Sequence, residues 1–334
     1  MRSNSIGKQV RQSLSTAGPL VAVILLSVIL SIATPAFFTM ENTMNILRQT
    51  AVNSIIAVGM LLVLITAGID LSVGSMCALS SCVMGVLLRD FGIENSFVLI
   101  IACILTGTMC GLLNGLIYTR LRLPHPFIAT LGTMQIFRGI AQIITDSTPI
   151  TGFPNAVTTL GFLNIGKLPL CFLVVVVVFF IFGFILNSTP IGKKIYSVGG
   201  NEEAALVSGI NVKNVKLLVY VISGLMSGLA ALILTGRVST ALPTTGENYA
   251  MDAIASCVIG GTSFNGGKGT VSGTFVGALL VQVIRNGLNL LGAQQDLQNV
   301  VIGSVVILAV VIDVFRELSG EKAARIAQSK AKNN

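Results

Sequence analysis

Long stretches without a charged side chain constrain this sequence more than any other feature. Only 10% of its residues are charged, against about 25% in soluble domains. A helix crosses the hydrocarbon layer of a membrane in about 20 residues, and peptide groups left unpaired in lipid are too costly for other structures to span it. The sequence therefore predicts an all-α, polytopic membrane protein. The uncharged runs include 12–40, 49–69, 71–88, 95–119, 168–192, 217–236, 269–284 and 297–312.

We predict about ten transmembrane helices in a single membrane domain, residues 18–315, with short tails at 1–17 and 316–334. The longest loops are then 146–167 and 188–215. The predicted spans are 18–38, 49–67, 71–89, 96–119, 125–145, 168–187, 216–236, 249–263, 269–292 and 297–314.

The basic residues predict the orientation of these spans. With ten spans both termini share one side, and 15 Lys and Arg residues fall on that side against 4 in the opposite loops. Short loops rich in Lys and Arg stay in the cytosol, so both termini and the 188–215 loop are predicted to be cytosolic. The net charge of +8 reflects this topology. No basic patch interleaved with aromatic residues exists, so we expect no nucleic-acid partner.

The N-terminus also fits a second interpretation, because a basic start before an apolar run is typical of a secretory signal peptide. The run from Pro19 to Phe38 is longer than the apolar part of such a peptide, and no small-x-small cleavage site follows it. We therefore expect an uncleaved first span.

Two pairs of short segments suggest an internal repeat. Ser81-Cys82-Val83-x-Gly85 matches Ser256-Cys257-Val258-x-Gly260, and Gly107-Thr108-x-x-Gly111 matches Gly273-Thr274-x-x-Gly277. In the predicted topology the matching spans run in opposite directions. The pattern would thus be an inverted repeat, which is common in transporters.

Signatures of catalysis, metal binding and ATP binding are missing. The chain has one histidine, His125, and its six cysteines lie in apolar runs without a C-x-x-C pair, as packing residues do. The stretch GGTSFNGGKGT (260–270) is not a phosphate loop, because Thr262 stands where Gly is needed and Gly269 where Ser or Thr is needed. We expect no cofactor on this chain, and any ATP that powers it must bind to a partner.

A polar loop at 188–215 separates two apolar runs and contains the pattern E-A-A-x-x-x-G at Glu203–Gly209. The pattern predicts a short helix with an early Glu and a face of small residues, ended by a glycine that adopts positive φ. Such a helix is suited to docking into a groove on a soluble partner. The alternative is an ordinary cytosolic loop.

The segment AGIDLSVGS (67–75) places Asp70 between two apolar runs. Asp70 is either a residue of a cytosolic turn, with Ser72 capping the next helix, or part of a break within the membrane made by Gly68 and Gly74. In the second case Asp70 lines a pathway, since intramembrane carboxylates are candidates for functional sites.

Five blocks resemble, in this order, the permease subunit of bacterial ribose-type monosaccharide ABC importers. They are TAGIDLSVGS (66–75), LPHPFIATLGTMQIFRG (123–139), GGNEEAALVSGINVKNVK (199–216), DAIASCVIGGTSFNGGKGTVSGTFVGAL (252–279) and NGLNLLG (286–292). The resemblance implies a multi-pass protein of the bacterial cytoplasmic membrane and a permease homodimer. It also implies an ATPase on a separate chain that binds ATP and Mg²⁺, and a periplasmic or lipid-anchored sugar-binding protein. The LPHPFI stretch is similar to the allose-type branch.

The resemblance also indicates which residues act. Those on the family's ATPase-coupling motif are Asn201, Glu202, Glu203, Ala204, Ala205 and Gly209. A sugar pathway needs weak polar contacts, and its candidates are Asn53, Thr66, Asp70, Ser72, Asn114, Thr130, Thr133, Gln135, Arg138, Asp252, Asn286 and Asn289. For the uncharged candidates the alternative is hydrogen bonding between helices. A mid-span arginine is costly unless paired or hydrated, so we expect Arg138 to face the pathway or to pair with Asp252 or Asp146.

We therefore predict the translocation subunit of an ATP-driven sugar importer that works by alternating access. An ion-coupled secondary transporter is the first alternative, but it needs no E-A-A loop and would show carboxylates in mid-span. A membrane enzyme is the second, but it would need clustered His, Asp and Glu.

Overall fold

The computed structural model describes residues 3–121, 123 and 125–311, and side chains from residue 18 onward. The predicted tail at 316–334 therefore lies outside the described residues. The helices are α1 (Ser3–Ala33), α2 (Met40–Ile65), α3 (Val73–Arg89), α4 (Ser96–Arg120), α5 (Pro126–Ile144), α6 (Asn155–Phe162), α7 (Leu170–Ser188), α8 (Pro190–Gly200), α9 (Glu202–Val207), α10 (Val212–Val238), α11 (Tyr249–Ile259), α12 (Val271–Leu290) and a last helix, Gln295–Val311.

Six of these helices are long and apolar enough to cross a membrane: α2, α4, α5, α7, α10 and α12. Four shorter apolar helices occupy the other predicted spans: Gly18–Ala33 of α1, α3, α11 and Gln295–Val311. The eighth predicted span, 249–263, is wrong as a full span. α11 has 11 residues, about 16 Å at 1.5 Å per residue, which is roughly half of the hydrocarbon layer.

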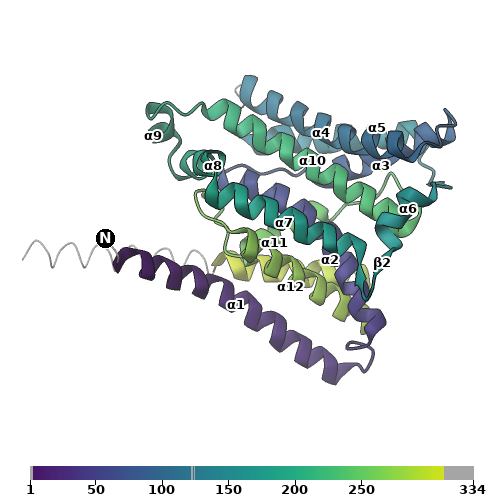
Figure 1. The fold of residues 1–334 in the computed structure, drawn as a ribbon, viewed down its shortest axis with the longest axis horizontal. Coiled ribbons are helices and arrows are strands. Elements are labelled where there is room, and N and C mark those ends of the chain that lie inside the picture. Colours follow the sequence, from purple (N-terminus) through teal and green to yellow (C-terminus); the bar gives the residue numbers. More distant parts are fainter. Residues whose placement is uncertain (1–2, 122, 124, 312–334) are drawn as a thin grey trace, which may run out of the picture.

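α2 forms the centre of the bundle, because all of its residues from Thr50 to Ile65 are buried. Around it pack α7, α10, α11 and α12, while α4 lies along α10 (Figure 1). The contact between α4 and α10 is close because glycines face each other: a Cβ on Gly107 would lie 2.5 Å from the carbonyl oxygen of Gly224. Small residues are what lets two membrane helices approach this far.

Two of the bundle's helices are followed by irregular segments that turn back into the protein. The first joins α2 to α3 through residues 66–72, and the second joins α10 to α11 through residues 239–248. These two segments, here called break 1 and break 2, come close at the start of α3. A Cβ on Gly74 would lie 2.0 Å from the oxygen of Gly246, and Gly246 itself has φ of +80°. Only glycine fits at this approach.

The two halves of the bundle make similar contacts. α3 packs against α4 and α10, and α11 packs against α12 and α2. These are contacts that an inverted repeat would make. The matched glycines themselves differ in surroundings, since Gly111 faces Tyr220 and Gly224 on α10 whereas Gly277 faces Ser256 on α11. The repeat thus stays a prediction.

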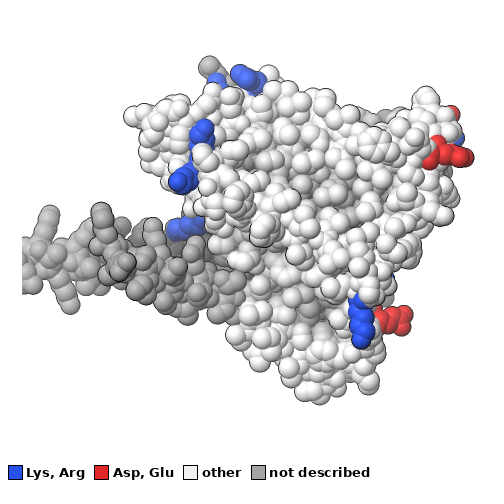
Figure 2. All heavy atoms as spheres, in the orientation of Figure 1, with Lys and Arg blue, Asp and Glu red and all other residues white. Residues whose placement is uncertain are grey.

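The ends of the bundle carry its loops and its charges. α8 and α9 lie at one end with the start of α10, and α6 lies at the other end (Figure 1). Two short pairings also form, β1 (Ile150–Thr151) with β4 (Thr240–Ala241) and β2 (Asn164–Ile165) with β3 (Leu168–Pro169). On the face in Figure 2 an uncharged belt separates a basic end from the end that carries the acidic side chains. Such a belt suits a bilayer.

Candidate functional site

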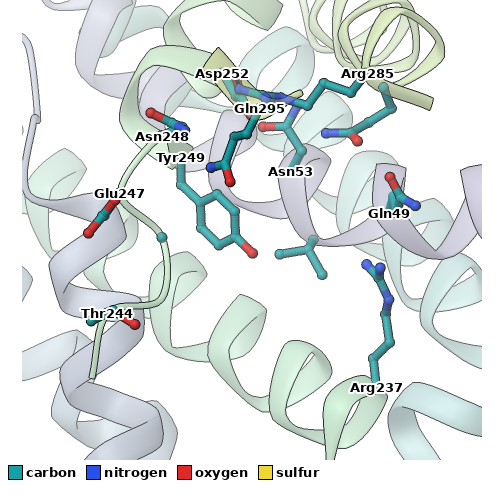
Figure 3. Close-up of a pocket in the computed structure, with 13 residues that line it drawn as sticks. Gln49, Asn53, Arg237, Thr244, Glu247, Asn248, Tyr249, Asp252, Arg285 and Gln295 are labelled. Carbon is teal, nitrogen blue, oxygen red and sulfur yellow. Dashed lines mark hydrogen bonds and ion pairs between the residues drawn. The ribbon is translucent and has the colours of Figure 1, made fainter. Parts of the chain in front are cut away.

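A polar pocket of about 340 Å³ opens where break 2 meets α2 and α12 (Figure 3). It extends from the last turn of α10, at Arg237, to the middle of α2, at Asn53. Its lining is Gln49, Val52, Asn53, Arg237, Thr244, Gly246, Glu247, Asn248, Tyr249, Asp252, Gln282, Arg285 and Gln295. So many polar side chains inside an apolar bundle indicate a site for a polar solute.

A buried ion pair stands at the inner wall of this pocket. Arg285 donates from Nε and Nη2 to the two carboxylate oxygens of Asp252, at 2.9 and 2.7 Å. The side chain of Asp252 is 5% exposed and that of Arg285 15%. A two-point pair of this geometry offsets much of the desolvation cost that each charge would have alone. Oxygens of Asp252 keep lone pairs that can accept from a hydroxyl.

Asn53 lines the same pocket and has a buried acceptor without a partner. Its Nδ2 donates to Ser256 Oγ at 3.0 Å, but its Oδ1 is buried and has no partner among the described residues. A buried acceptor without a partner is costly unless water or a ligand satisfies it. Asn53 is therefore a candidate contact for a solute that donates hydrogen bonds.

The four charged side chains that line the pocket sum to zero, since Arg237 and Arg285 are balanced by Glu247 and Asp252. Figure 3 shows Tyr249 and Arg237 extending into the same space, below Asp252 and Arg285. A neutral lining does not select an anion. An aromatic ring beside amides and a carboxylate suits a neutral molecule with one apolar face and many hydroxyls.

A second polar cluster surrounds break 1 and is closed to solvent. Asp70 is fully buried and accepts hydrogen bonds from Ser72 N at 3.0 Å, Ser72 Oγ at 2.7 Å and Ser223 Oγ at 2.8 Å. Asn114 Nδ2 donates to Ser72 Oγ at 2.7 Å, and Thr130 Oγ1 to the carbonyl of Ile69 at 3.3 Å. Asp70 is therefore buried in the bundle and does not lie in a turn open to solvent, and its place on the pathway stays a prediction. Ser72 does lie at the N-cap of α3, but its hydroxyl bonds Asp70 rather than capping the helix.

Arg138 is bonded to backbone carbonyls of break 2 and not to Asp252 or Asp146. Its Nη1 donates to the carbonyl oxygens of Pro243 and Thr245, at 2.5 and 2.6 Å. The predicted pairing with Asp252 is wrong because Arg285 occupies that carboxylate, and no ion pair between Arg138 and Asp146 forms. Arg138 therefore positions the wall of the pocket.

The remaining pathway candidates lie elsewhere. Thr133 bonds backbone carbonyls within α5, and Gln135 is exposed on the same helix. Asn286 exchanges two amide hydrogen bonds with Asn42, at 2.8 and 3.0 Å, as the interhelical alternative predicts. Of the predicted pathway residues, the structure brings Asn53 and Asp252 to the pocket.

The E-A-A pattern forms a capped helix, as predicted. Asn201 is the N-cap of α9, and its Oδ1 accepts from the backbone N–H of Ala204 at 2.8 Å. Glu202 and Glu203 stand in the first turn, where their charges favour the helix dipole. Gly209 follows the helix with φ of +81°.

The two alanines of α9, Ala204 and Ala205, lie on different faces of the helix. Ala205 is buried within the bundle, while Ala204 is exposed. The expectation that both alanines enter a partner's groove is therefore wrong for Ala205. The outward face carries Leu206 and Val207 instead, which are 64% and 89% exposed. Apolar side chains this exposed at a charged end of the protein indicate a contact with another protein.

α8 anchors the loop to the bundle. A Cβ on Gly199 would lie 1.6 Å from the carbonyl oxygen of Ile65, which also accepts from Gly267 N at 2.8 Å. Tyr196 donates to the carbonyl of Gly269 at 2.7 Å, and burial raises the pKa of Tyr196, so the hydroxyl keeps its proton. The 260–270 turn thus packs between α8 and the end of α2.

Sequence reasoning missed Arg237, Arg285, Tyr249 and Gln282 as pocket residues. Arg285 could have been found from the sequence, because it is a second arginine inside a predicted span. An arginine at such a position needs an acidic partner or water. Arg237 was placed in an external loop, and nothing in its sequence neighbourhood indicates that break 2 folds inward beside it.

The sequence of the chain is similar to those of known transport proteins. Residues 42–310 match the family described as "Branched-chain amino acid transport system / permease component". The ribose import permease protein RbsC of Bacillus subtilis (strain 168) is 44% identical over 89% of this chain and 92% of its own length. RbsC of Haemophilus influenzae is 42% identical over 94% and 98%. The D-allose transport system permease protein AlsC of Escherichia coli (strain K12) is 37% identical over 88% and 89%. No solved structure matches the chain.

Proposed function

Because the chain belongs to the family of transport-system permease components, we propose that it forms the translocation pathway for a monosaccharide of the ribose type. The chain is a multi-pass permease subunit of the cytoplasmic membrane and not itself an enzyme. A binding protein delivers the sugar, and a separate ATPase that binds ATP and Mg²⁺ supplies the energy. The higher identity to the ribose permeases than to the allose permease favours ribose over the branch that LPHPFI suggested.

The observation that carries this proposal is the neutral polar pocket at break 2. Its two arginines and two carboxylates cancel, and one pair is already joined. A sugar phosphate or another anion would leave a net negative charge in an apolar bundle, whereas a neutral sugar replaces water with hydroxyl contacts at no charge cost. Weak contacts suit a permease, because the solute must also leave.

Asp252 also argues against an ion-coupled secondary transporter. Its carboxylate is occupied by two hydrogen bonds from Arg285. A site for a coupling proton or sodium ion needs acceptor oxygens without a fixed cation. Asp70, the other buried carboxylate among the described residues, already accepts three hydrogen bonds.

The exposed face of α9 is the proposed contact with the ATPase. Leu206 and Val207 would enter a groove on that subunit, while Ala205 holds the helix to the bundle. ATP binding would move α9, and the bundle would then alternate between an outward and an inward opening.

A second copy of the chain is proposed to pack against α5. Gln135 is the tenth residue of this 19-residue helix, near mid-membrane, and its amide has no hydrogen-bond partner in the described part of the chain. Gly132 and Gly139 lie on the same face with open space around them. A polar amide flanked by glycines suits a close contact between two membrane helices.

The test is uptake into vesicles that contain this chain with its ATPase and binding protein. Labelled ribose should accumulate only with ATP, and unlabelled ribose should compete better than allose. Leucine should not compete, although the family's description names amino acids. Uptake of leucine, or uptake driven by an ion gradient without ATP, would overturn the proposal.

Arg285→Lys adds a test of the pocket itself. Lysine keeps the charge but loses the two-point geometry, so transport should fall by about tenfold while the protein still inserts. Lys213→Arg, an exposed change on α10, is the matched control and should transport normally.

A further inference from the structure

The helix α9, which is proposed above to contact the ATPase, lies near break 1. A cleft of about 420 Å³ separates them, and Thr66 and Ala67 of break 1 line it together with Asn201, Glu202 and Glu203. α9 therefore has room to move toward or away from break 1. Besides the backbone that joins α9 to α8 and α10, movement of α9 can reach break 1 through side chains that touch both walls of this cleft.

Lys216, in the first turns of α10, lies in this cleft and contacts both sides. Its Nζ lies 2.7 Å from Glu202 Oε2 on α9 and 3.0 Å from the hydroxyl of Tyr118 on α4. The ammonium also stands 5.1 Å from the centre of the Tyr118 ring. The side chain of Lys216 is 11% exposed and that of Glu202 is 56% exposed. The contact with Glu202 is thus the weak one, because water screens an exposed pair.

Behind Lys216, contacts continue one helical turn at a time to break 1. The ring of Tyr118 packs edge-on against Tyr220, with centroids 5.9 Å apart. Tyr220 donates to the carbonyl of Ile69 at 3.1 Å, and Ser223 donates to Asp70 at 2.8 Å.

The second route runs along α4. Asn114, one turn before Tyr118, donates to Ser72 at 2.7 Å. Residues four apart lie on one face of a helix, so α4 and α10 each present a continuous stripe from the cleft to break 1.

We infer that Lys216 is the positioning residue through which movement of α9 reaches break 1. The inference rests on the proposed function, in which α9 binds the ATPase. The buried end of the linkage is fixed by Tyr118, and the exposed end at Glu202 can break and form again during each cycle. A shift of α9 would then reposition Tyr118 and Tyr220, and with them the carbonyl of Ile69 and the carboxylate of Asp70. Loss of Lys216 should leave the ATPase bound and active but disconnected from transport.

The test compares Lys216→Met with Lys213→Met in vesicles that hold the permease, its ATPase and the sugar-loaded binding protein. Methionine keeps an unbranched stem but removes the charge, and Lys213 is an exposed lysine on the same helix. We expect Lys216→Met to bind the ATPase and to hydrolyse ATP within about twofold of wild type, with uptake per ATP lowered about tenfold. Lys213→Met should keep the wild-type ratio.

Two further variants separate coupling from folding. Lys216→Arg keeps the charge and should keep most of the transport, whereas Tyr118→Phe keeps the ring and should lower uptake per ATP by about threefold. If Lys216→Met does not insert, Tyr118→Phe carries the test. The inference is overturned if Lys216→Met and Tyr118→Phe both keep the wild-type ratio of uptake to hydrolysis. It is also overturned if Lys216→Met loses ATPase binding, hydrolysis and uptake together. Failure of the proposed function is distinct, because the wild-type protein itself would then show no ATP-driven uptake.

Discussion

Arg138 bonds two backbone carbonyls of the segment that lines the polar pocket. A guanidinium presents its donors in a fixed fork, so a single side chain can hold Pro243 and Thr245 in place together. The carbonyls of Pro243 and Thr245 lie outside the β4 pairing and outside any helix, and inside a membrane such carbonyls need another partner. Arg138 is the partner that lets break 2 fold inward.

Replacing this arginine should harm the fold as well as transport. Arg138→Leu leaves two part-buried carbonyls without their donor, and a fully buried unsatisfied group costs about 1–3 kcal/mol, which is the upper limit for each. We expect a lower yield of inserted protein and faster loss of monodisperse protein on heating in detergent. Arg138→Lys should be intermediate.

The double variant Arg138→Leu/Asp252→Asn distinguishes this role from an acid pair. If Arg138 and Asp252 were partners, the second change would restore the yield. Because Asp252 forms its ion pair with Arg285, the yield of the double variant should instead be lower than that of either single variant. Restoration would mean that the pairing seen here is not the one in the membrane.

These residues also show where sequence reasoning ends. The sequence indicated that Arg138 needs a partner or water, because a charge in mid-span is costly alone, and it offered Asp252 and Asp146 as possible partners. It could not indicate which partner, since that depends on how break 2 turns. The pocket's amides and acids were visible in the sequence, but only the fold brings Asn53 of α2, Asp252 of α11 and Arg285 of α12 together.

At the scale of the element, α9 is held from one side and exposed on the other. Ala205 packs into the bundle, and Val207 is 89% exposed two residues later. The helix has six residues, too few to be stable alone, so its shape depends on the Asn201 cap and on Ala205.

Substitutions on the exposed and the buried face of α9 should have different effects on protein yield and on binding of the ATPase. Val207→Asp should leave the yield unchanged, because exposed substitutions cost little, but should abolish co-purification of the ATPase. Ala205→Arg places an unpaired charge in the bundle and should lower the yield itself. Co-purification of the ATPase with Val207→Asp at the wild-type level would contradict the proposed docking face.

The helices themselves were largely predictable from the sequence. The predicted spans of mostly apolar residues correspond to α2, α4, α5, α7, α10 and α12. The E-A-A pattern with Gly209 predicted α9. The prediction failed at α11, because the uncharged residues 260–263 that follow this half-length helix make the stretch look like a longer span. Gly246, whose positive φ lets break 2 approach the start of α3, looks in the sequence like any other loop glycine.

At the scale of the whole molecule, the orientation in the membrane stays a prediction. Lys194 on α8 and Asn155 on α6 are both exposed, and these two helices lie at opposite ends of the bundle (Figure 1). Single cysteines at the two positions, in a cysteine-free background, should therefore differ in their reaction with a membrane-impermeant thiol reagent. In intact cells Asn155→Cys should react and Lys194→Cys should not. The reverse pattern would invert the topology.

Dimerisation through α5 makes the last prediction. The six native cysteines are buried and can be replaced, so one new cysteine reports one contact. Gln135 lies at the middle of an exposed helix face, between Gly132 and Gly139. If two copies meet there about a two-fold axis, the same residue of each copy lies close to its counterpart. Gln135→Cys should then form a disulfide-linked dimer under mild oxidation.

The control is Phe180→Cys on α7, which is 77% exposed on another side of the bundle. It should stay monomeric under the same oxidation, because a residue far from the axis does not meet its copy. Equal cross-linking at both positions would indicate random collision, and cross-linking at position 180 alone would move the dimer contact to α7. A cross-link at position 135 would also account for the unpaired amide at the middle of α5, since each Gln135 would then bond its counterpart across the axis of the dimer.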